Sequence, residues 1–256
     1  MTFPVVFNLL GHPVHAHEVL ELAGYAAGSQ LFVLLGRRMP GPKLDFEQGT
    51  LVVLGCLIGA LVGSRVLAMI ESIHAYWPMR HDPMILISGK TIAGGLAGGW
   101  AGVEIVKRAL GIKQSTGDRF VFPILLGICV GRIGCFLEGL PDHTYGIATS
   151  LPWGVDFGDG VRRHPTQLYE IVFCIVLAAL ILLRMRRPWR CGELFRLFMI
   201  GYFAWRFAVE FVKPRETYGG LSPIQMTSLA VVCAALIGLR NLRASTSLPE
   251  TAVAHA

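Results

Sequence analysis

Charged side chains are scarce in this chain of 256 residues. Asp, Glu, Lys and Arg make up 16% of it, against about 25% in an average soluble domain. Hydrophobic residues make up 53%, and the mean hydropathy is +0.55. The sequence also lacks an internal repeat and a low-complexity segment. These absences exclude a disordered chain and a fibrous repeat, and they argue against an ordinary soluble enzyme.

Metal-binding and disulfide motifs are missing as well. His12, His15 and His17 fall within six residues, but without supporting carboxylates or cysteines they are weak ligands, and we expect no metal site. The six cysteines contain no Cys-x-x-Cys pair, which disfavours a disulfide or zinc framework. We expect most of them to be small buried hydrophobic residues. They are Cys56, Cys129, Cys135, Cys174, Cys191 and Cys233.

Long apolar segments are abundant. Seven of them are long enough, or nearly so, to cross a hydrocarbon layer of about 30 Å as helices. We therefore predict an all-α, polytopic membrane protein with seven transmembrane helices. The predicted spans are residues 17–36, 48–71, 90–109, 119–138, 165–184, 192–212 and 222–240.

Lys and Arg residues are distributed unevenly between the loops. Of the 23, thirteen fall on one side of the predicted spans and six on the other. The positive-inside rule then places the N-terminus outside and the C-terminus in the cytoplasm. The net charge of +6 is therefore explained mostly by topology, and we expect no nucleic-acid partner.

The predicted spans belong to one domain. Residues 1–243 are expected to form a single integral-membrane domain, and residues 244–256 a disordered C-terminal tail. Only one loop is long, the segment 139–164 on the outer side, which is rich in Gly, Pro and Asp. No basic segment precedes the first apolar stretch, so we expect no cleavable signal sequence.

Four arginines lie inside predicted spans, where an ionisable group costs about 2.5–3.5 kcal/mol. Arg65 and Arg196 are near enough to a span end for their guanidinium groups to reach the interface. Arg132 and Arg206 each come about six residues before the outer end of their span, which places both roughly 9 Å below the boundary. Two cations at one depth repel each other unless an anion lies between or beside them.

Arg206 belongs to a polar stripe. Tyr202 and Glu210 lie four residues before and after it, so they share its helix face. One interpretation is a buried Arg–Glu pair that only fixes helix packing. The other is a pocket for a phosphate in the outer leaflet, because a planar guanidinium binds phosphate oxygens in pairs and stays charged when buried.

The fifth span begins with a polar motif, His-Pro-Thr-Gln-Leu-Tyr-Glu at 164–170. Pro165 suits the first turn of a helix, and the free N–H groups of a helix start favour an anion. Gln167 and Glu170 project from one side of that helix. An ordinary interfacial collar of polar residues would look similar.

Glycine is concentrated in the run Ala-Gly-Gly-Leu-Ala-Gly-Gly-Trp-Ala-Gly at 93–102. Small residues at four-residue spacing let helix backbones touch. The alternative is that bare backbone lines a lipid cavity. The run is not a phosphate-binding loop, because no Gly-Lys-Ser/Thr follows it.

Three motifs together resemble the bacterial prolipoprotein diacylglyceryl transferase family. The first is Gly-Arg-Ile-Gly-Cys-Phe at 131–136, followed by a further glycine. The second is the motif at 164–170, and the third is Tyr202 with Arg-Phe-Ala-Val-Glu-Phe at 206–211. The resemblance covers residues 90–212 well and the remainder by topology.

The resemblance implies an activity. The family transfers a diacylglyceryl group from phosphatidylglycerol to the lipobox cysteine thiol of a prolipoprotein, forming a thioether and releasing glycerol phosphate. A thiolate is the competent nucleophile, and fixed cations stabilise the charge that builds on the departing phosphate ester. The implied location is the bacterial inner membrane. The implied partners are phosphatidylglycerol, lipobox-containing prolipoproteins and membrane lipids, with no metal or organic cofactor.

The resemblance also assigns roles to residues. Arg132 and Arg206 would hold the phosphate, and Glu210 would orient Arg206. These three and His164 are the predicted catalytic residues. The predicted substrate-binding residues are Arg132, Gly131, Gly134, Gln167, Tyr169, Glu170, Tyr202, Gly94 and Gly95.

The chain departs from the family pattern in places. Ala93 stands where the family usually has a histidine before Gly-Gly-Leu, and Cys135 stands where it usually has an asparagine. The loop after the first motif is longer than usual and lacks a glutamate proposed as general base. His164 or His143 could substitute, since a histidine suits proton removal from a thiol. Cys135 is either a packing substitution or an intermediate acceptor.

These departures leave alternatives to a transferase open. One is a catalytically silent or repurposed relative that binds anionic phospholipid or lipoprotein segments. A transporter or channel is disfavoured, because the intramembrane charges cluster at one leaflet depth and do not trace a path across the bilayer.

Overall fold

A computed structural model of the chain describes residues 2–9, 11–36, 38–39, 41, 44–79 and 89–244. Arg37, Lys43 and Arg80, which contribute to the predicted orientation, lie outside the described residues. So does the predicted tail from residue 245 onward.

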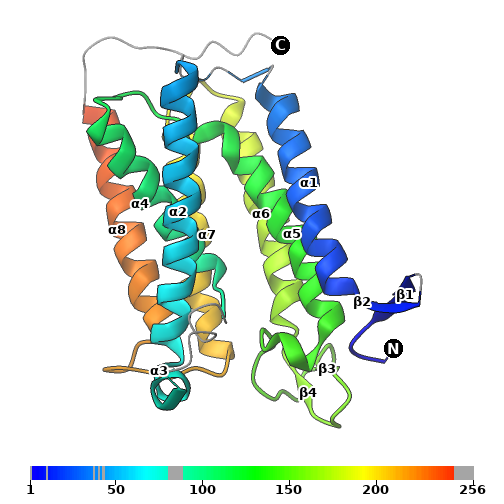
Figure 1. The fold of residues 1–256 in the computed structure, drawn as a ribbon. Coiled ribbons are helices and arrows are strands. Elements are labelled where there is room, and N and C mark those ends of the chain that lie inside the picture. Colours follow the sequence, from blue (N-terminus) through cyan, green and yellow to red (C-terminus); the bar gives the residue numbers. More distant parts are fainter. Residues whose placement is uncertain are drawn as a thin grey trace.

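Seven long helices make up most of the structure (Figure 1). Each corresponds to one predicted span, with ends that differ by a few residues. They are α1 (Ala16–Gly36), α2 (Phe46–Glu71), α4 (Ile92–Ala109), α5 (Val121–Glu138), α6 (Thr166–Met185), α7 (Glu193–Val209) and α8 (Pro223–Ala244).

Short elements connect the long helices. The helical ones are α3 (Ile73–Tyr76), η1 (Trp77–Met79), η3 (Asp118–Phe120), η4 (Leu140–Asp142) and η5 (Glu210–Val212). Two antiparallel hairpins pair β1 (Val6–Leu9) with β2 (His12–His15) and β3 (Val155–Asp156) with β4 (Arg162–Arg163). Both hairpins lie at the same end of the bundle, where α1 begins and α5 ends (Figure 1).

Five helical segments are long and apolar enough to cross a membrane: α1, α2, Asp118–Glu138, α6 and α8. Their large side chains also face outward. Leu61 on α2 and Val172 on α6 are each 61% exposed, and broad exposed apolar surfaces mark contact with lipid or protein. Helices α4 and α7 are not among these five segments. Helix α4 contains the charged residues Glu104, Lys107 and Arg108, and α7 is short, with 17 residues.

The buried core is centred on α7. Its buried face includes Leu194, Phe198, Met199 and Phe203, each with 0% exposure. Helix α7 packs on α8 and on α6, and α5 packs on α6 and α1. Burial of this apolar face against α6 and α8 places α7 inside the bundle. This arrangement places α5, α6 and α7 side by side.

Glycines set the contact between α2 and α4. A side chain added at Gly59 or Gly63 of α2 would collide with the backbone of Gly98 or Gly94 on α4, and the converse also holds. Close approach of backbones at small residues drives helix association in membranes. The packing interpretation of the glycine run is therefore confirmed for this pair of helices.

We predict that Gly59→Ala destabilises the protein, because the new methyl group would meet the carbonyl oxygen of Gly98. Overpacking of this kind costs roughly 1–3 kcal/mol. The matched control is Gly49→Ala, at the start of the same helix, where an added Cβ meets nothing within 4 Å. Thermal unfolding midpoints in detergent should fall for Gly59→Ala only; equal midpoints would contradict the packing account.

Candidate functional site

A carboxylate from α6 lies between two guanidinium groups from the neighbouring helices. Glu170 Oε2 is 2.9 Å from Arg132 Nη2 of α5 and 3.4 Å from Arg206 Nη1 of α7. All three side chains are buried, with at most 6% of each exposed. The two arginines predicted at one depth thus share one anion, and they face each other across it.

Two further groups complete this cluster. The Tyr202 hydroxyl donates a 2.6 Å hydrogen bond to Glu170 Oε1. Arg206 Nη2 donates to Glu210 Oε1 at 3.0 Å, and the Ser222 hydroxyl donates to the other oxygen of Glu210 at 3.4 Å. The predicted stripe of Tyr202, Arg206 and Glu210 on one face is confirmed.

The charges within this cluster balance, but its hydrogen bonds do not. Two arginines and two glutamates offset each other, as buried charges require. The Nε atoms of Arg132 and Arg206 are nevertheless buried without a hydrogen-bond partner, as are both amide atoms of Gln167. Unsatisfied buried donors cost about 1–3 kcal/mol each. The nitrogen donors among these atoms are what an oxygen-rich anion would satisfy, whereas Gln167 Oε1 is an acceptor.

His164 and Tyr169 form a second group near the start of α6. His164 Nδ1 lies 3.1 Å from the Tyr169 hydroxyl, which also accepts a 2.8 Å hydrogen bond from Trp153 Nε1. Within the described part of the chain, none of these hydrogen bonds reaches Arg132 or Arg206. The predicted catalytic role of His164 therefore stays a prediction.

The predicted glycine positions differ in their surroundings. Gly94 touches α2, and a Cβ on Gly134 would approach the backbone of His17 on α1 at 3.1 Å. Gly95 faces α2 at ordinary van der Waals distance, and Gly131 has nothing within 4 Å of an added Cβ. Helix contacts thus account for Gly94 and Gly134, while the space beside Gly131 is open. Their role in binding substrate stays a prediction.

Cys135 lies beside this cluster, one turn beyond Arg132. Its thiol sulfur is 3.7 Å from Arg132 Nη1 and is buried. Ala93, the other departure from the family pattern, is buried to 1% exposure on α4. His143 adopts a left-handed backbone conformation (φ 54°) and is exposed.

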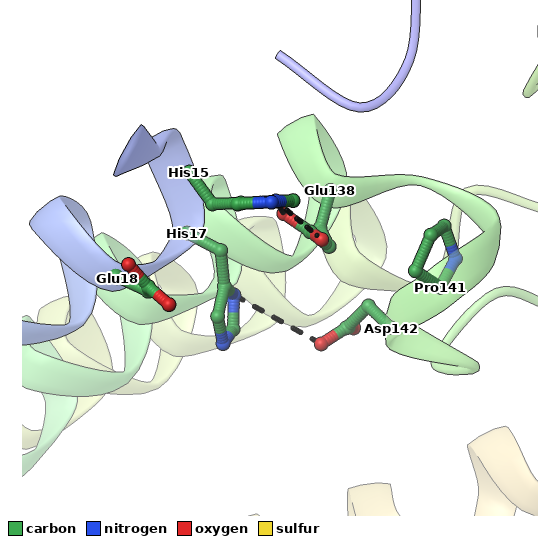
Figure 2. Close-up of a pocket in the computed structure, with 6 residues that line it drawn as sticks. All are labelled: His15, His17, Glu18, Glu138, Pro141 and Asp142. Atoms are coloured by element: carbon green, nitrogen blue, oxygen red, sulfur yellow. Dashed lines mark hydrogen bonds and ion pairs between the residues drawn. The ribbon is translucent and has the colours of Figure 1, made fainter. Parts of the chain in front are cut away.

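A cavity of about 250 Å³ opens at the end of the bundle near Cys135. Figure 2 shows its lining from β2, α1, α5 and η4. His15 and Glu138 pair at 2.9 Å, and His17 Nδ1 lies 3.9 Å from Asp142 Oδ1. His15 and His17 belong to the histidine group seen in the sequence, but Glu138 and Asp142 are far from them in the chain and join them only when α1 packs on α5.

Lys213 lies directly after η5, beyond the helix that carries Arg206. Partial burial, and then the positive charge of Arg206, lower the pKa of Lys213 to about 8. The pKa of this lysine, at the edge of the charged cluster, thus lies well below that of an ordinary lysine.

Outward-facing apolar helices and a buried Arg–Glu–Arg cluster define a multi-pass membrane protein with a charged site inside its helix bundle. A family model described as prolipoprotein diacylglyceryl transferase matches residues 4–240. The chain belongs to this family.

Curated relatives agree with this assignment. A phosphatidylglycerol–prolipoprotein diacylglyceryl transferase of Bordetella bronchiseptica is 36% identical over 251 residues, covering 90% of this chain and 92% of the relative. The protein of the same name from Cupriavidus necator is 31% identical, covering 88% and 85%. That of Bordetella parapertussis is 30% identical, covering 90% and 92%.

Removal of the shared anion tests the role of the cluster in the fold. We expect Glu170→Gln to lower the free energy of unfolding by roughly 3–5 kcal/mol, because two buried guanidinium groups lose their common partner. Asp159→Asn is the control, since Asp159 binds both Nη atoms of Arg163 at 2.7 Å on an exposed hairpin. Denaturant unfolding in detergent should show a large loss of stability for Glu170→Gln and a small one for Asp159→Asn. Similar small losses for both variants would refute the role of Glu170 in holding the two arginines.

The pKa of Lys213 predicts a pH dependence. Between about pH 8 and pH 10 the unfolded chain keeps a proton that folded Lys213 has released, so the free energy of unfolding rises with pH. Below pH 8 both states are protonated, and the folded state carries the cost of a partly buried charge. Lys213→Gln should flatten the rise in unfolding midpoints across this window. An unchanged slope would show that Lys213 does not titrate there.

Proposed function

We propose that this chain transfers a diacylglyceryl group from phosphatidylglycerol to the lipobox cysteine thiol of prolipoproteins. A sulfur–carbon bond forms at the glyceryl carbon, the carbon–oxygen bond to phosphate breaks, and glycerol phosphate leaves with the electron pair. The thiol proton goes to a base before attack. The names of the relatives and the family membership support this activity.

The observation that carries the proposal is the pair of arginines on one carboxylate. Glu170 holds Arg132 and Arg206 at a common point, while the Nε donor of each arginine stays free. A lipid phosphate can engage these free donors without breaking the ion pairs that position them. Preorganised donors of this kind stabilise the charge that develops on the leaving phosphate.

Neighbouring residues complete the proposed pocket. Glu210 orients Arg206, and Tyr202 holds Glu170. Gln167 offers unpaired amide atoms one turn before Glu170, where the hydroxyls of a glycerol headgroup would find partners. His164 and Tyr169 would shape the entrance to the headgroup site. Gly94, Gly95, Gly131 and Gly134 would keep backbone close to the lipid.

The proposed arrangement in the membrane has seven spans, with α4 and α7 added to the five apolar segments. The N-terminus lies outside and the C-terminus in the cytoplasm, which follows the distribution of basic residues. The site then faces the outer leaflet of the bacterial inner membrane. Residues 1–243 act as one domain, and lipid and lipobox peptide enter sideways from the bilayer.

A second function is favoured by one observation. Ala93 replaces a histidine that the family usually carries, and a buried methyl group cannot move a proton. A silent relative would bind anionic phospholipid or lipoprotein segments without transferring them. The two functions differ in whether a covalent product forms.

The discriminating experiment uses a strain depleted of its own transferase. The full chain is expressed there with a reporter prolipoprotein, and the reporter's mass is followed. We expect a diacylglyceryl increment that disappears with Arg132→Ala. A stably inserted protein that adds no increment would reject the transferase and leave the lipid-binding relative.

We also predict that Arg206→Lys abolishes transfer although it keeps the charge, because the ammonium group cannot contact Glu170, Glu210 and a phosphate at once. Arg196→Lys is a matched control on the same helix. Its guanidinium donates to one carbonyl, that of Gly192 at 2.8 Å, which a lysine can also do. Wild-type activity in Arg206→Lys would count against the phosphate role.

A further inference from the structure

Three potential metal ligands meet beside the charged cluster. His17 from α1, Cys135 from α5 and Asp142 from η4 each offer one donor atom, and these atoms all lie within 4.8 Å of one another. Tetrahedral zinc sites have ligand separations of roughly 3.3–3.8 Å. Small side-chain rotations would therefore bring the three donors onto one ion. Figure 2 shows His17 and Asp142 directed toward each other at the cavity.

Each of the three side chains has an outer polar partner nearby. His17 Nε2 lies 3.7 Å from Glu21, which Lys90 binds at 2.6 Å. The second oxygen of Asp142 accepts a hydrogen bond from the Thr144 hydroxyl. Cys135 receives the 3.7 Å contact from Arg132. Metal ligands in proteins are typically supported in this way, with a carboxylate behind the histidine.

One ligand atom on the inner face of this cluster is unsatisfied. His17 Nδ1 is buried without a hydrogen-bond partner, although it points toward Asp142 at 3.9 Å. The adjoining cavity is lined by the carboxylates of Glu18, Glu138 and Asp142. A buried nitrogen lone pair beside several anions is an environment that favours a cation.

We propose that His17, Cys135 and Asp142 bind a zinc ion. Nitrogen, sulfur and oxygen donors from a histidine, a cysteine and a carboxylate suit Zn²⁺, and hard cations such as Mg²⁺ would not choose the sulfur. Three protein ligands leave a fourth tetrahedral position open, as in catalytic zinc sites. Since His17 and Asp142 line the cavity, the open position faces it.

The open position gives the ion a role, which rests on the proposed function. The acceptor thiol binds there, its sulfur–hydrogen bond breaks, a zinc–sulfur bond forms, and the proton passes to water in the cavity. A metal-bound thiol is deprotonated outright. The ion would thus supply the thiolate in a chain that lacks a general base of the family pattern. The later attack on the glyceryl carbon converts the thiolate into a weakly held thioether, which leaves the ion.

Metal binding is tested on the full chain purified in detergent. After treatment with a chelator and addition of Zn²⁺ or Co²⁺, we expect one ion per chain and, with cobalt, a thiolate charge-transfer absorption band. Cys135→Ala should abolish the band, and Asp142→Asn should weaken zinc binding by about 100-fold. The outer variant Glu21→Gln should weaken it by about 10-fold.

The matched control is Cys129→Ala, on the same helix but six residues from Cys135, which should bind as wild type does. A wild-type chain that takes up no zinc would overturn the proposal. So would a cobalt band that survives in Cys135→Ala. Neither readout depends on transfer, so failure of the site is separable from failure of the proposed activity.

The role of the ion has its own test. A short lipobox peptide added to the cobalt-loaded chain should increase the thiolate band about twofold, because a second sulfur enters the open position. The same peptide with serine in place of cysteine should leave the band unchanged. An unchanged band with the cysteine peptide would overturn the role, as would full transfer by the chelator-treated chain.

Discussion

The arrangement of α5, α6 and α7 depends on one carboxylate in an apolar environment. Glu170 pairs with Arg132 and Arg206 together. Arg206 also pairs with Glu210, whereas Glu170 is the one ion-pair partner of Arg132 among the described residues. Because each of the three residues comes from a different helix, the charge requirement fixes how these helices align in depth and rotation. The membrane strengthens this constraint, since lipid offers no competing polar partner.

The same pairing of charges explains how a stable fold can keep unpaired hydrogen-bond donors at the site. Glu210, Tyr202 and Ser222 hold the inner sides of the cluster, so that Arg132 and Arg206 retain free Nε donors. The arginine side chains are therefore held by hydrogen bonds to the protein, while their Nε donors stay unpaired for a phosphate. Electrostatic preorganisation of this type is an effective way to stabilise a transition state.

The helices and the stripe on α7 could be predicted from the sequence, because hydropathy marks spans and residues four apart share a helix face. The contacts of Glu170 with both arginines could not be predicted from the sequence, since they depend on how three separate helices pack. The resemblance assigns Glu170 only to substrate binding, and its central position between the two arginines emerges from the structure. The meeting of His17, Cys135 and Asp142 also lies beyond sequence periodicity, because it requires α1 to pack on α5.

The central claim is that Arg132 and Arg206 contact a lipid phosphate. Solid-state NMR of the full chain in bilayers can measure dipolar coupling between the phosphorus of phosphatidylglycerol and arginine side-chain nitrogens. We predict a coupling that corresponds to about 4 Å, as in a paired guanidinium–phosphate contact, and its loss in the Arg132→Gln/Arg206→Gln double variant. A wild-type chain without this coupling, or a double variant that retains it, would contradict the account.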